Sequence, residues 1–394
     1  MRLLHTSDWH LGRTLHRADL AGAQAGFLDG LVATVRAERV DAVLVAGDVY
    51  DRAVPSVDAV ALYDDAIVRL REAGARVVVT SGNHDSAARL GVGSRLVDAA
   101  GVHVRTRPQG VAEPVLLEDG HGPVAVYGLP YLEPDAVRAV LPPDPVGGTA
   151  EVRGHAGVLG RAMSCVRADL AGRRARSVVL AHAWVAGGLD SDSERDITVG
   201  GVGHVPPRLF DGVDYTALGH LHGPQVLRDG LRYSGSPLAY SFSEAAHVKG
   251  SWLVELDAQG LARVEQVPSP PARPLSVLRG ELADLLTSAG HAPFEGHWLS
   301  VVLTDAARPD DAMERLRRRF PHVLVLEWRP ADGSPDERSY GARVAGRDDL
   351  DVVAEFVRHV RCGGSTSSAG APDDDERALL REAVEAGRLA GMRA

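Results

Sequence analysis

The sequence has almost no lysine. All but one of its 43 basic residues are arginine, and the single lysine, Lys249, lies in "AAHVKGS". A P-loop that holds nucleotide phosphates needs the pattern G-x-x-x-x-G-K-[ST], which this segment does not have. The chain therefore contains no P-loop of its own.

Cysteines and long apolar runs are also scarce. The two cysteines, Cys165 and Cys362, are far apart and have no spacing typical of a metal site. Their scarcity excludes a disulfide framework and favours a reducing compartment. No apolar run reaches 18 residues, and the N-terminal "MRLLHTSDWH" is not a signal peptide. We therefore expect a cytoplasmic protein without membrane contact.

Chain length and net charge limit the number of domains and the kind of phosphate-binding surface that the protein can have. The chain has 394 residues, of which 45% are hydrophobic, so it can bury a large core and form two or three domains. Its formal net charge is -10 at pH 7, which argues against a uniformly basic surface for nucleic acid. Any phosphate binding would have to use a local patch or bound cations.

Short apolar runs alternate with amphipathic stretches in the first part of the chain. The runs begin at Arg2, Ala42, Arg76, Val124, Ser177 and Tyr215. Helices are expected over about 20–38 and 56–73, the second with Ser56 as its N-cap. Strands separated by helices predict an α/β domain, here residues 1–267, whose sheets are covered by helices on both faces. It closes with antiparallel strands between Arg232 and Val267.

A linker and two smaller segments follow. "PSPPARP", residues 268–274, is typical of a linker. Residues 275–335 show a second β/α pattern, with strands near 275–279, 298–304 and 322–328 and helices near 281–288 and 309–319. The segment 345–394 predicts two helices joined by "GGSTSSAGAP". Their apolar stripes could pack within the chain, but the terminal position favours docking of another protein.

Five of the apolar runs in the first domain end in side chains that bind metals. "SDWH" supplies Asp8 and His10, "GDVYD" supplies Asp48, "GNHD" supplies Asn83, His84 and Asp85, "AHAW" supplies His182, and "GHLH" supplies His220 and His222. Residues i and i+2 of an extended backbone point the same way, so we expect Asp8 to converge with His10 and His220 with His222. Open α/β sheets bind ligands at this edge.

Each of these motifs alone is weak evidence. A single histidine at a strand end is more often a hydrogen-bonded structural residue, and "GNHD" by itself could be only a turn. The five motifs occur together in one domain, and the combination favours a metal centre.

The order of these motifs resembles the calcineurin-like metallophosphoesterase superfamily. "SDSERDITVGG" and "RYSGSPLAYSFSE" are similar to its SbcD branch, the bacterial nuclease subunits of a DNA double-strand-break repair complex. The resemblance implies a β-sandwich flanked by helices, a smaller α+β capping domain that binds DNA, and a C-terminal helical tail. It also implies an exonuclease and endonuclease that acts on double-stranded DNA ends and hairpins in repair and recombination.

The resemblance assigns roles to the motif residues. Asp8, His10, Asp48 and His222 would hold one divalent ion, and Asp48, Asn83, His182 and His220 would hold a second. A nitrogen and oxygen donor set without thiolate suits Mn²⁺, and iron, zinc and magnesium are alternatives; the superfamily expectation is Mn²⁺. His84 would contact the scissile phosphate or protonate the leaving group. Asp85 would either orient the ring of His84 or cap the helix that begins near Ser86.

The resemblance also implies partners. These are an SMC-like ATPase of the SbcC type, bound through the C-terminal helices, a second copy of the chain, and DNA in a nucleoid-associated cytoplasmic complex. Helices near residues 56–99 are a possible dimer surface. Arginines that follow the motifs could contact phosphates, although each could equally be an ordinary surface residue: Arg13, Arg17, Arg52 and Arg89.

Two other functions fit the same motifs. One is a different phosphoesterase, such as a phosphatase or a nucleotide phosphodiesterase, but the additional residues after the linker disfavour it. The other is a non-catalytic adaptor at DNA ends, which the complete set of ligand positions disfavours.

Overall fold

The computed structural model describes residues 1–145, 147, 153–195, 197, 203–270, 272–330, 347–361 and 370–391. The chain divides into two compact units, Met1–Ala272 and Arg273–Ala394. The ends of the expected segments 275–335 and 345–394, and most of "GGSTSSAGAP", lie outside the described residues.

The first unit contains two six-stranded mixed sheets. In the first sheet the order is β14-β13-β1-β4-β5-β6. Four of these strands run parallel: β1 (Arg2–Thr6), β4 (Ala42–Ala46), β5 (Arg76–Thr80) and β6 (Val102–Arg105). The antiparallel pair β13 (Gly250–Asp257) and β14 (Gly260–Pro268) closes the sheet on the β1 side.

The second sheet has the order β11-β12-β10-β9-β8-β7. Its parallel strands are β8 (Gly122–Leu129), β9 (Arg176–His182), β10 (Tyr215–Gly219) and β12 (Leu231–Tyr233). Its antiparallel edge strands are β7 (Val115–Asp119) and β11 (Gln225–Arg228). A separate two-stranded hairpin is formed by β2 (Thr14–Leu15) and β3 (Ala18–Asp19).

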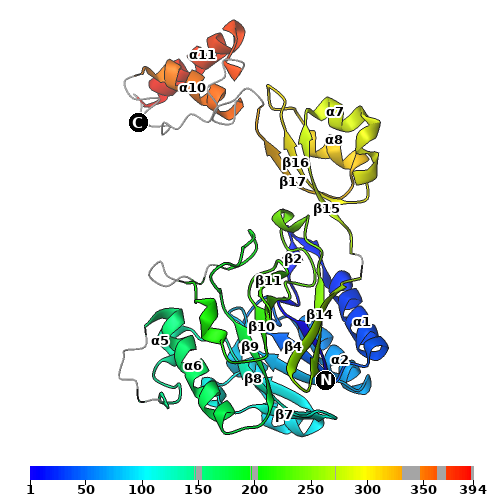
Figure 1. Ribbon diagram of the computed structural model, residues 1–394. Helices are drawn as coiled ribbons and strands as arrows, with labels where there is room; N and C mark the ends of the chain where they lie inside the picture. Colours follow the sequence, from blue (N-terminus) through cyan, green and yellow to red (C-terminus); the bar gives the residue numbers. More distant parts are fainter. Residues whose placement is uncertain are drawn as a thin grey trace. The chain divides into compact units, whose positions relative to one another are not determined.

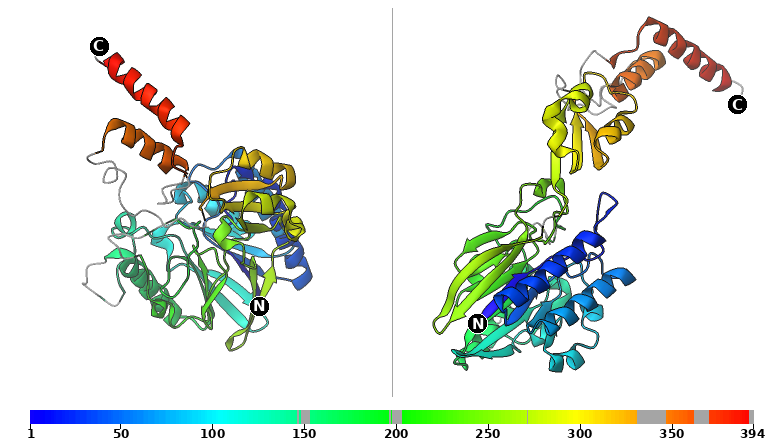
Figure 2. Two further views of the ribbon diagram at one scale, coloured as in Figure 1. Left: turned by 90° about the horizontal axis from the view of Figure 1, so that it is seen from above. Right: turned by 90° about the vertical axis from the view of Figure 1, so that its right-hand side faces the viewer.

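Helices cover the outer faces of both sheets, as Figures 1 and 2 show. The long helices are α1 (Ala21–Glu38), α2 (Val57–Glu72) and α6 (Gly154–Ala171). Ser56 caps α2 by accepting the backbone N–H of Ala59 at 3.2 Å, as expected. The short helices are α3 (Ala87–Leu90), α4 (Ser94–Val97), α5 (Pro134–Val137), and the 3₁₀ turns η1 (Asp98–Ala100), η2 (Pro108–Gly110), η3 (Pro207–Phe210) and η4 (Phe242–Glu244).

Strand periodicity explains why both faces of each sheet are buried. Successive side chains of a strand point to opposite faces. In β1, Leu4 joins the cluster under α1 and α2, whereas Leu3 joins a cluster shared by the two sheets, together with Leu44 and Val178. The unit is therefore a sandwich of two sheets between helical layers, which confirms the β-sandwich flanked by helices that the resemblance implies. The expectation of helices on both faces of each sheet is wrong, because the inner faces pack against each other.

The second unit contains a three-stranded parallel sheet, β15 (Leu275–Gly280), β16 (Trp298–Leu303) and β17 (Val323–Trp328). Its helices are α7 (Leu282–Thr287), η5 (Ala289–Phe294), α8 (Ala312–Arg319), α10 (Asp349–Arg361) and α11 (Asp374–Gly391). Leu285, Leu316 and Phe320 form the centre of its apolar core.

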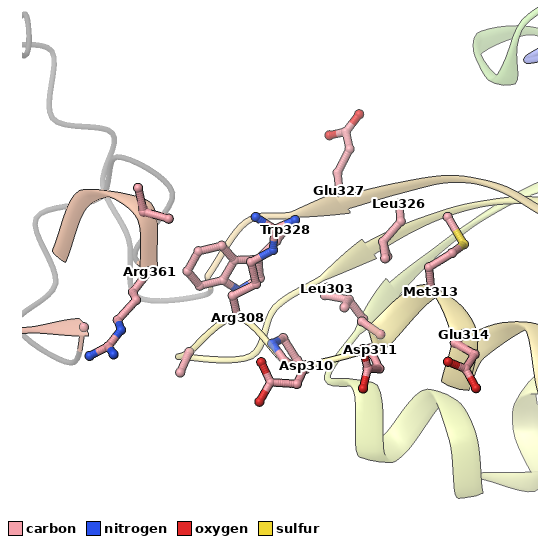
Figure 3. Close-up of a pocket in the computed structure, with 15 residues that line it drawn as sticks. Leu303, Arg308, Asp310, Asp311, Met313, Glu314, Leu326, Glu327, Trp328 and Arg361 are labelled. Carbon is pink, nitrogen blue, oxygen red and sulfur yellow. The ribbon is translucent and has the colours of Figure 1, made fainter. Parts of the chain in front are cut away.

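The second unit also has a pocket of about 810 Å³, shown in Figure 3. Four carboxylates line it, against two guanidinium groups. The lining charged residues are Arg308, Asp310, Asp311, Glu314, Glu327 and Arg361. Carboxylates outnumber guanidinium groups in this lining, which disfavours phosphate binding.

None of the helices in the described part of the chain is both long enough and apolar enough to cross a membrane.

His5 on β1 links the two sheets through a buried polar contact. Its Nδ1 lies 2.9 Å from the Tyr215 hydroxyl, and its Nε2 lies 3.0 Å from the Leu218 carbonyl oxygen. A carbonyl only accepts, so Nε2 carries the proton and Nδ1 accepts from Tyr215. Burial lowers the pKa of His5 to about 3, although the Leu218 carbonyl opposes the shift. The ring is therefore neutral in the folded protein.

We predict that His5 makes the fold sensitive to acid. Its pKa is lower in the folded chain than in the unfolded chain, so the unfolded state binds the additional proton. The stabilisation is complete above about pH 6.5 and falls by up to about 1.4 kcal/mol per pH unit as the pH drops toward 3. Urea unfolding at pH 8, 6 and 5 should give a shallower pH slope for His5→Gln than for the wild type. Equal slopes would show that His5 is not responsible.

Candidate metal centre

The candidate site residues follow the carboxyl ends of five strands. Asp8 and His10 follow β1, Asp48 follows β4, and Asn83 follows β5 in the first sheet. In the second sheet, His182 ends β9, while His220 and His222 follow β10. The two sheets therefore deliver ligand-type side chains from both sides of the sandwich.

The backbone at these positions is unusual. Asp8, His10, Asp48 and His220 all have positive φ, with values of 52°, 45°, 49° and 109°. Such conformations cost non-glycine residues about 1–3 kcal/mol each and persist only where the surrounding structure holds them. Our expectation that Asp8 and His10 converge through extended backbone is wrong, because β1 ends at Thr6 and left-handed turns direct both side chains.

Two glycines of the motifs allow the strand ends to approach each other. A Cβ at Gly82 would lie 2.0 Å from Asp48 Oδ1, and a Cβ at Gly219 would lie 1.9 Å from the Ala46 carbonyl oxygen. Contacts this short are not tolerated, so neither position accepts a side chain. The glycine before Asn83 and the glycine before His220 are thus required by packing.

The candidate ligands form overlapping clusters of buried side chains. Ligand atoms lie within 4.8 Å of one another in three groups: Asp8, His10 and His222; His10, Asp48 and His84; and Asp8, Asp48 and His182. Asp48 Oδ2 lies 3.6 Å from His10 Nε2 and 3.5 Å from His182 Nε2. Asp48 therefore lies between the two halves of the site.

His220 and His222 diverge from each other, so our expectation that these two side chains converge is wrong. His222 Nε2 lies 3.1 Å from His10 Nε2. His220 Nδ1 lies 3.3 Å from Asn83 Oδ1, which is also 2.9 Å from His182 Nε2. One histidine of the pair thus faces each half of the site, and the structure brings together all seven residues expected to bind metal.

The donor set of this cluster fits divalent cations. His182 Nδ1 is 3.0 Å from the Ala46 carbonyl oxygen, to which it donates. In the neutral ring, Nε2 then presents a lone pair to Asn83 Oδ1, which is also an acceptor. A cation between two such acceptors would remove the repulsion.

The electrostatics of the site agree with this geometry. The pKa of Asp48 is raised well above its usual value by burial and by the nearby charges of Asp85 and Asp8. Burial also raises the pKa of Asp8 and lowers the pKa values of His10 and His220. The nearby charge of Arg13 opposes the shift in the pKa of Asp48 without offsetting it, and bound divalent ions would supply further positive charge.

His84 lies beside the cluster. Its Nδ1 is 2.8 Å from the Asp51 carbonyl oxygen, and its ring centroid is 4.7 Å from that of His10 in an edge-on contact. Burial lowers the pKa of His84 to about 4, although the Asp51 carbonyl opposes the shift. Because Nδ1 donates to this carbonyl, the neutral ring has its lone pair on Nε2.

Asp85 has partners other than those expected. Its carboxylate accepts backbone N–H groups of Val49 at 3.1 Å, Tyr50 at 3.0 Å and Gly82 at 2.9 Å. Its carboxylate therefore ties the turn after β5 to the turn after β4, rather than contacting the ring of His84. The cap of α3 is Ser86, whose hydroxyl accepts the N–H of Arg89.

The four arginines expected to contact phosphates differ in their exposure to solvent. Arg13 is mostly buried, and its Nη2 donates to the Ser193 carbonyl at 2.8 Å. Arg89 is exposed, and its Nη1 donates to the Ala53 carbonyl at 3.1 Å. Arg17 and Arg52 are exposed, Arg52 with its Nε 3.5 Å from Asp51. The last two are the better candidates for contact with a ligand in solvent.

The motifs in the sequence did not identify a set of polar side chains around His222. Ser193, Glu194, Glu244 and Lys249 all contact this residue or its immediate partners. The first three lie in motifs that carry the resemblance, and Lys249 entered only the argument against a P-loop. A signal was available, because these polar residues lie close to the ligand motifs in the first unit.

Sequence models of two families match the chain. Residues 1–235 match the family described as calcineurin-like phosphoesterase. Residues 271–361 match SbcD_C, described as the type 5 capsule protein repressor C-terminal domain. The first match covers more than half of the chain, and the second covers most of the described second unit.

Several solved structures show a distant likeness. TT1561 of Thermus thermophilus has 15% identity and a TM-score of 0.38, covering 68% of this chain and 98% of that chain. GAP50, described as the anchor in the inner membrane complex of Plasmodium, has 12% identity and a TM-score of 0.41. The match covers 85% of this chain and 98% of that chain. A dimetal phosphatase from Danio rerio has 14% identity and a TM-score of 0.39. The match covers 68% of this chain and 99% of that chain.

We predict that Asp48 is needed for both metal ions. Asp48→Ala should lose most of the bound metal, because its carboxylate lies between the two histidine groups. Inductively coupled plasma mass spectrometry after dialysis against Mn²⁺ would measure the metal content of each protein. Asp211→Ala, at an exposed ion pair with Arg228, serves as the matched control. Two tightly bound ions in Asp48→Ala would contradict the assignment.

Proposed function

The chain belongs to the calcineurin-like phosphoesterase family, and from this we propose that it is a DNA nuclease dependent on two divalent metal ions. We propose that it cleaves double-stranded ends and hairpins as an exonuclease and endonuclease, together with an SbcC-type ATPase, in DNA repair and recombination. The observation that supports the metal-dependent chemistry most strongly is the convergence of seven ligand-type side chains from five strand ends.

In this proposal the ligands divide between two positions. Asp8, His10 and His222 would hold one ion, Asn83, His182 and His220 would hold the other, and Asp48 would contribute to both. When bound, such ions would supply activation of a water molecule and stabilisation of negative charge on the phosphoryl and leaving oxygens. Mn²⁺ is the proposed metal, since imidazole, carboxylate and amide donors without thiolate suit it.

His84 would act on the substrate from the side of the site near His10. The Asp51 carbonyl fixes its tautomer, so Nε2 is free to accept a hydrogen bond or a proton. In the proposed reaction His84 contacts the scissile phosphate, or takes up a proton from water at Nε2 and delivers it to the leaving oxygen. Asp85 positions His84 indirectly, by holding the turn on which both residues lie.

The SbcD_C match supports the choice of a nuclease over other phosphoesterases. The absence of a P-loop from the sequence is consistent with a separate ATPase subunit. For DNA contact we propose Arg17 and Arg52, which are exposed, with Arg89 less available and Arg13 mostly buried.

We propose α10 and α11 as the docking element for the ATPase. Phe356 and Val360 on α10 and Leu379 on α11 are exposed apolar side chains. Helices with such a stripe bind in apolar grooves of partner proteins. For the proposed homodimer, Val57 on α2 and Leu96 on α4 are exposed apolar residues that a second copy could cover.

We predict manganese-dependent cleavage of DNA. The purified chain should degrade a linear duplex with Mn²⁺ and lose this activity with EDTA, while hydrolysing p-nitrophenyl phosphate poorly. His84→Ala should reduce cleavage about 10²- to 10⁴-fold, the usual contribution of a general acid, while retaining its metal. Efficient hydrolysis of the monoester without DNA cleavage would support a phosphatase instead. Activity on neither substrate, with metal bound, would support an adaptor.

We also predict that the C-terminal helices are required for binding the ATPase. A chain truncated at residue 345 should lose an SbcC-type partner in a pull-down and keep basal cleavage of DNA, because the candidate ligands all lie in the first unit. A full-length double variant, Phe356→Asp with Leu379→Asp, is a more specific test of docking, because it removes only exposed apolar side chains. Unchanged capture of the partner by both proteins would refute this docking assignment.

A further inference from the structure

His222 is held by a set of buried polar contacts on the side away from the candidate metal. Its Nε2 faces His10 Nε2 at 3.1 Å, and its Nδ1 lies 2.5 Å from the Ser193 hydroxyl oxygen. Its backbone is also fixed, because its N–H donates to Glu194 Oε1 at 2.6 Å and its carbonyl accepts from Lys249 Nζ at 2.8 Å. The residue therefore has little freedom to move.

The Ser193 contact continues to a buried carboxylate. The hydroxyl of Ser193 donates to Glu244 Oε1 at 2.5 Å. Glu244 has no exposed surface and lies 51 residues further along the chain, at the end of η4. Glu244 Oε1 also lies 3.6 Å from His222 Nδ1. Moving away from the candidate metal, the imidazole of His222 is followed by the hydroxyl of Ser193 and then by the carboxylate of Glu244.

Lys249 completes the chain of contacts. Its ammonium group donates to Glu244 Oε2, to the Ser236 hydroxyl at 3.0 Å and to the His222 carbonyl at 2.8 Å. Lysine has three N–H donors, and all three have partners here. The side chain of Lys249 is 9% exposed, so the pair with Glu244 is buried, and removing one partner would leave an uncompensated charge.

The charge state of Glu244 sets the direction of the hydrogen bonds. Glu244 is ionised, because its buried carboxylate forms an ion pair with the ammonium group of Lys249. An ionised carboxylate only accepts, so the Ser193 hydroxyl donates its proton to Glu244. The Ser193 oxygen then accepts from His222 Nδ1–H, which leaves the lone pair of the neutral ring on Nε2.

We propose that Ser193, Glu244 and Lys249 are positioning residues that fix His222 in the tautomer with its lone pair on Nε2, directed at the metal. A carboxylate commonly orients a metal-bound histidine directly, and here a serine lies between them. The inference rests on the proposed metal site, but the tautomer is a property of the metal-free protein. Its consequence is that the affinity for one of the two ions depends on residues that do not touch it.

The direct test is the protonation of the His222 ring. Long-range ¹H–¹⁵N spectra of the metal-free protein, with the His222 signals assigned by their loss in His222→Gln, should show a proton on Nδ1 and none on Nε2. In Ser193→Ala the ring should populate both tautomers. Calorimetric titration with Mn²⁺ should then show about 10- to 100-fold weaker binding of one ion, the usual effect of losing an outer-shell partner.

Ser243→Ala is the matched control, because Ser243 is an exposed serine beside Glu244 whose hydroxyl accepts the Asp192 N–H and donates to the Ser241 hydroxyl. It should leave the tautomer and the Mn²⁺ affinity unchanged. A proton on Nε2 of His222 in the wild type would overturn the proposal, even if Ser193→Ala did not fold. Unchanged tautomer and affinity in a folded Ser193→Ala would also overturn it. Failure of the wild type to bind Mn²⁺ would refute the proposed function instead, and the tautomer would still decide this inference.

Discussion

The structure of the first unit depends on the close approach of five strand ends around buried carboxylates and imidazoles. The approach is so tight that Gly82 and Gly219 leave no room for a Cβ, and four site residues adopt left-handed backbone conformations. Both features cost free energy, and the burial of Asp8 and Asp48 near each other costs more. Divalent cations at this position would offset these costs, since they bind only the folded arrangement.

The sequence predicted the fold well, because strands and helices of this domain have clear periodicity. Leu3 and Leu4 already show it, since both are apolar and each faces a different core, which is typical of a strand buried on both sides. The convergence of the seven ligand-type residues followed from the position of their motifs after apolar runs. The reason given for Asp8 and His10 was wrong, because the end of β1 could not be located to the residue from its composition.

Other features of the site could not be predicted from local patterns. Asp85 binds three backbone N–H groups, two of them on a turn 35 and 36 residues earlier in the chain, and no spacing rule identifies such a partner. The contacts of Ser193 with Glu244 likewise join distant segments. Arg13 follows a site motif as Arg17 does, yet only the tertiary structure shows that it is mostly buried and donates to the Ser193 carbonyl.

The central claim is that two metal ions share Asp48, and anomalous diffraction from crystals grown with Mn²⁺ tests it most directly. We expect two anomalous peaks about 3.5–4 Å apart, both within bonding distance of Asp48, with His10 and His222 near one and His182 and His220 near the other. A single peak, or peaks away from Asp48, would contradict it.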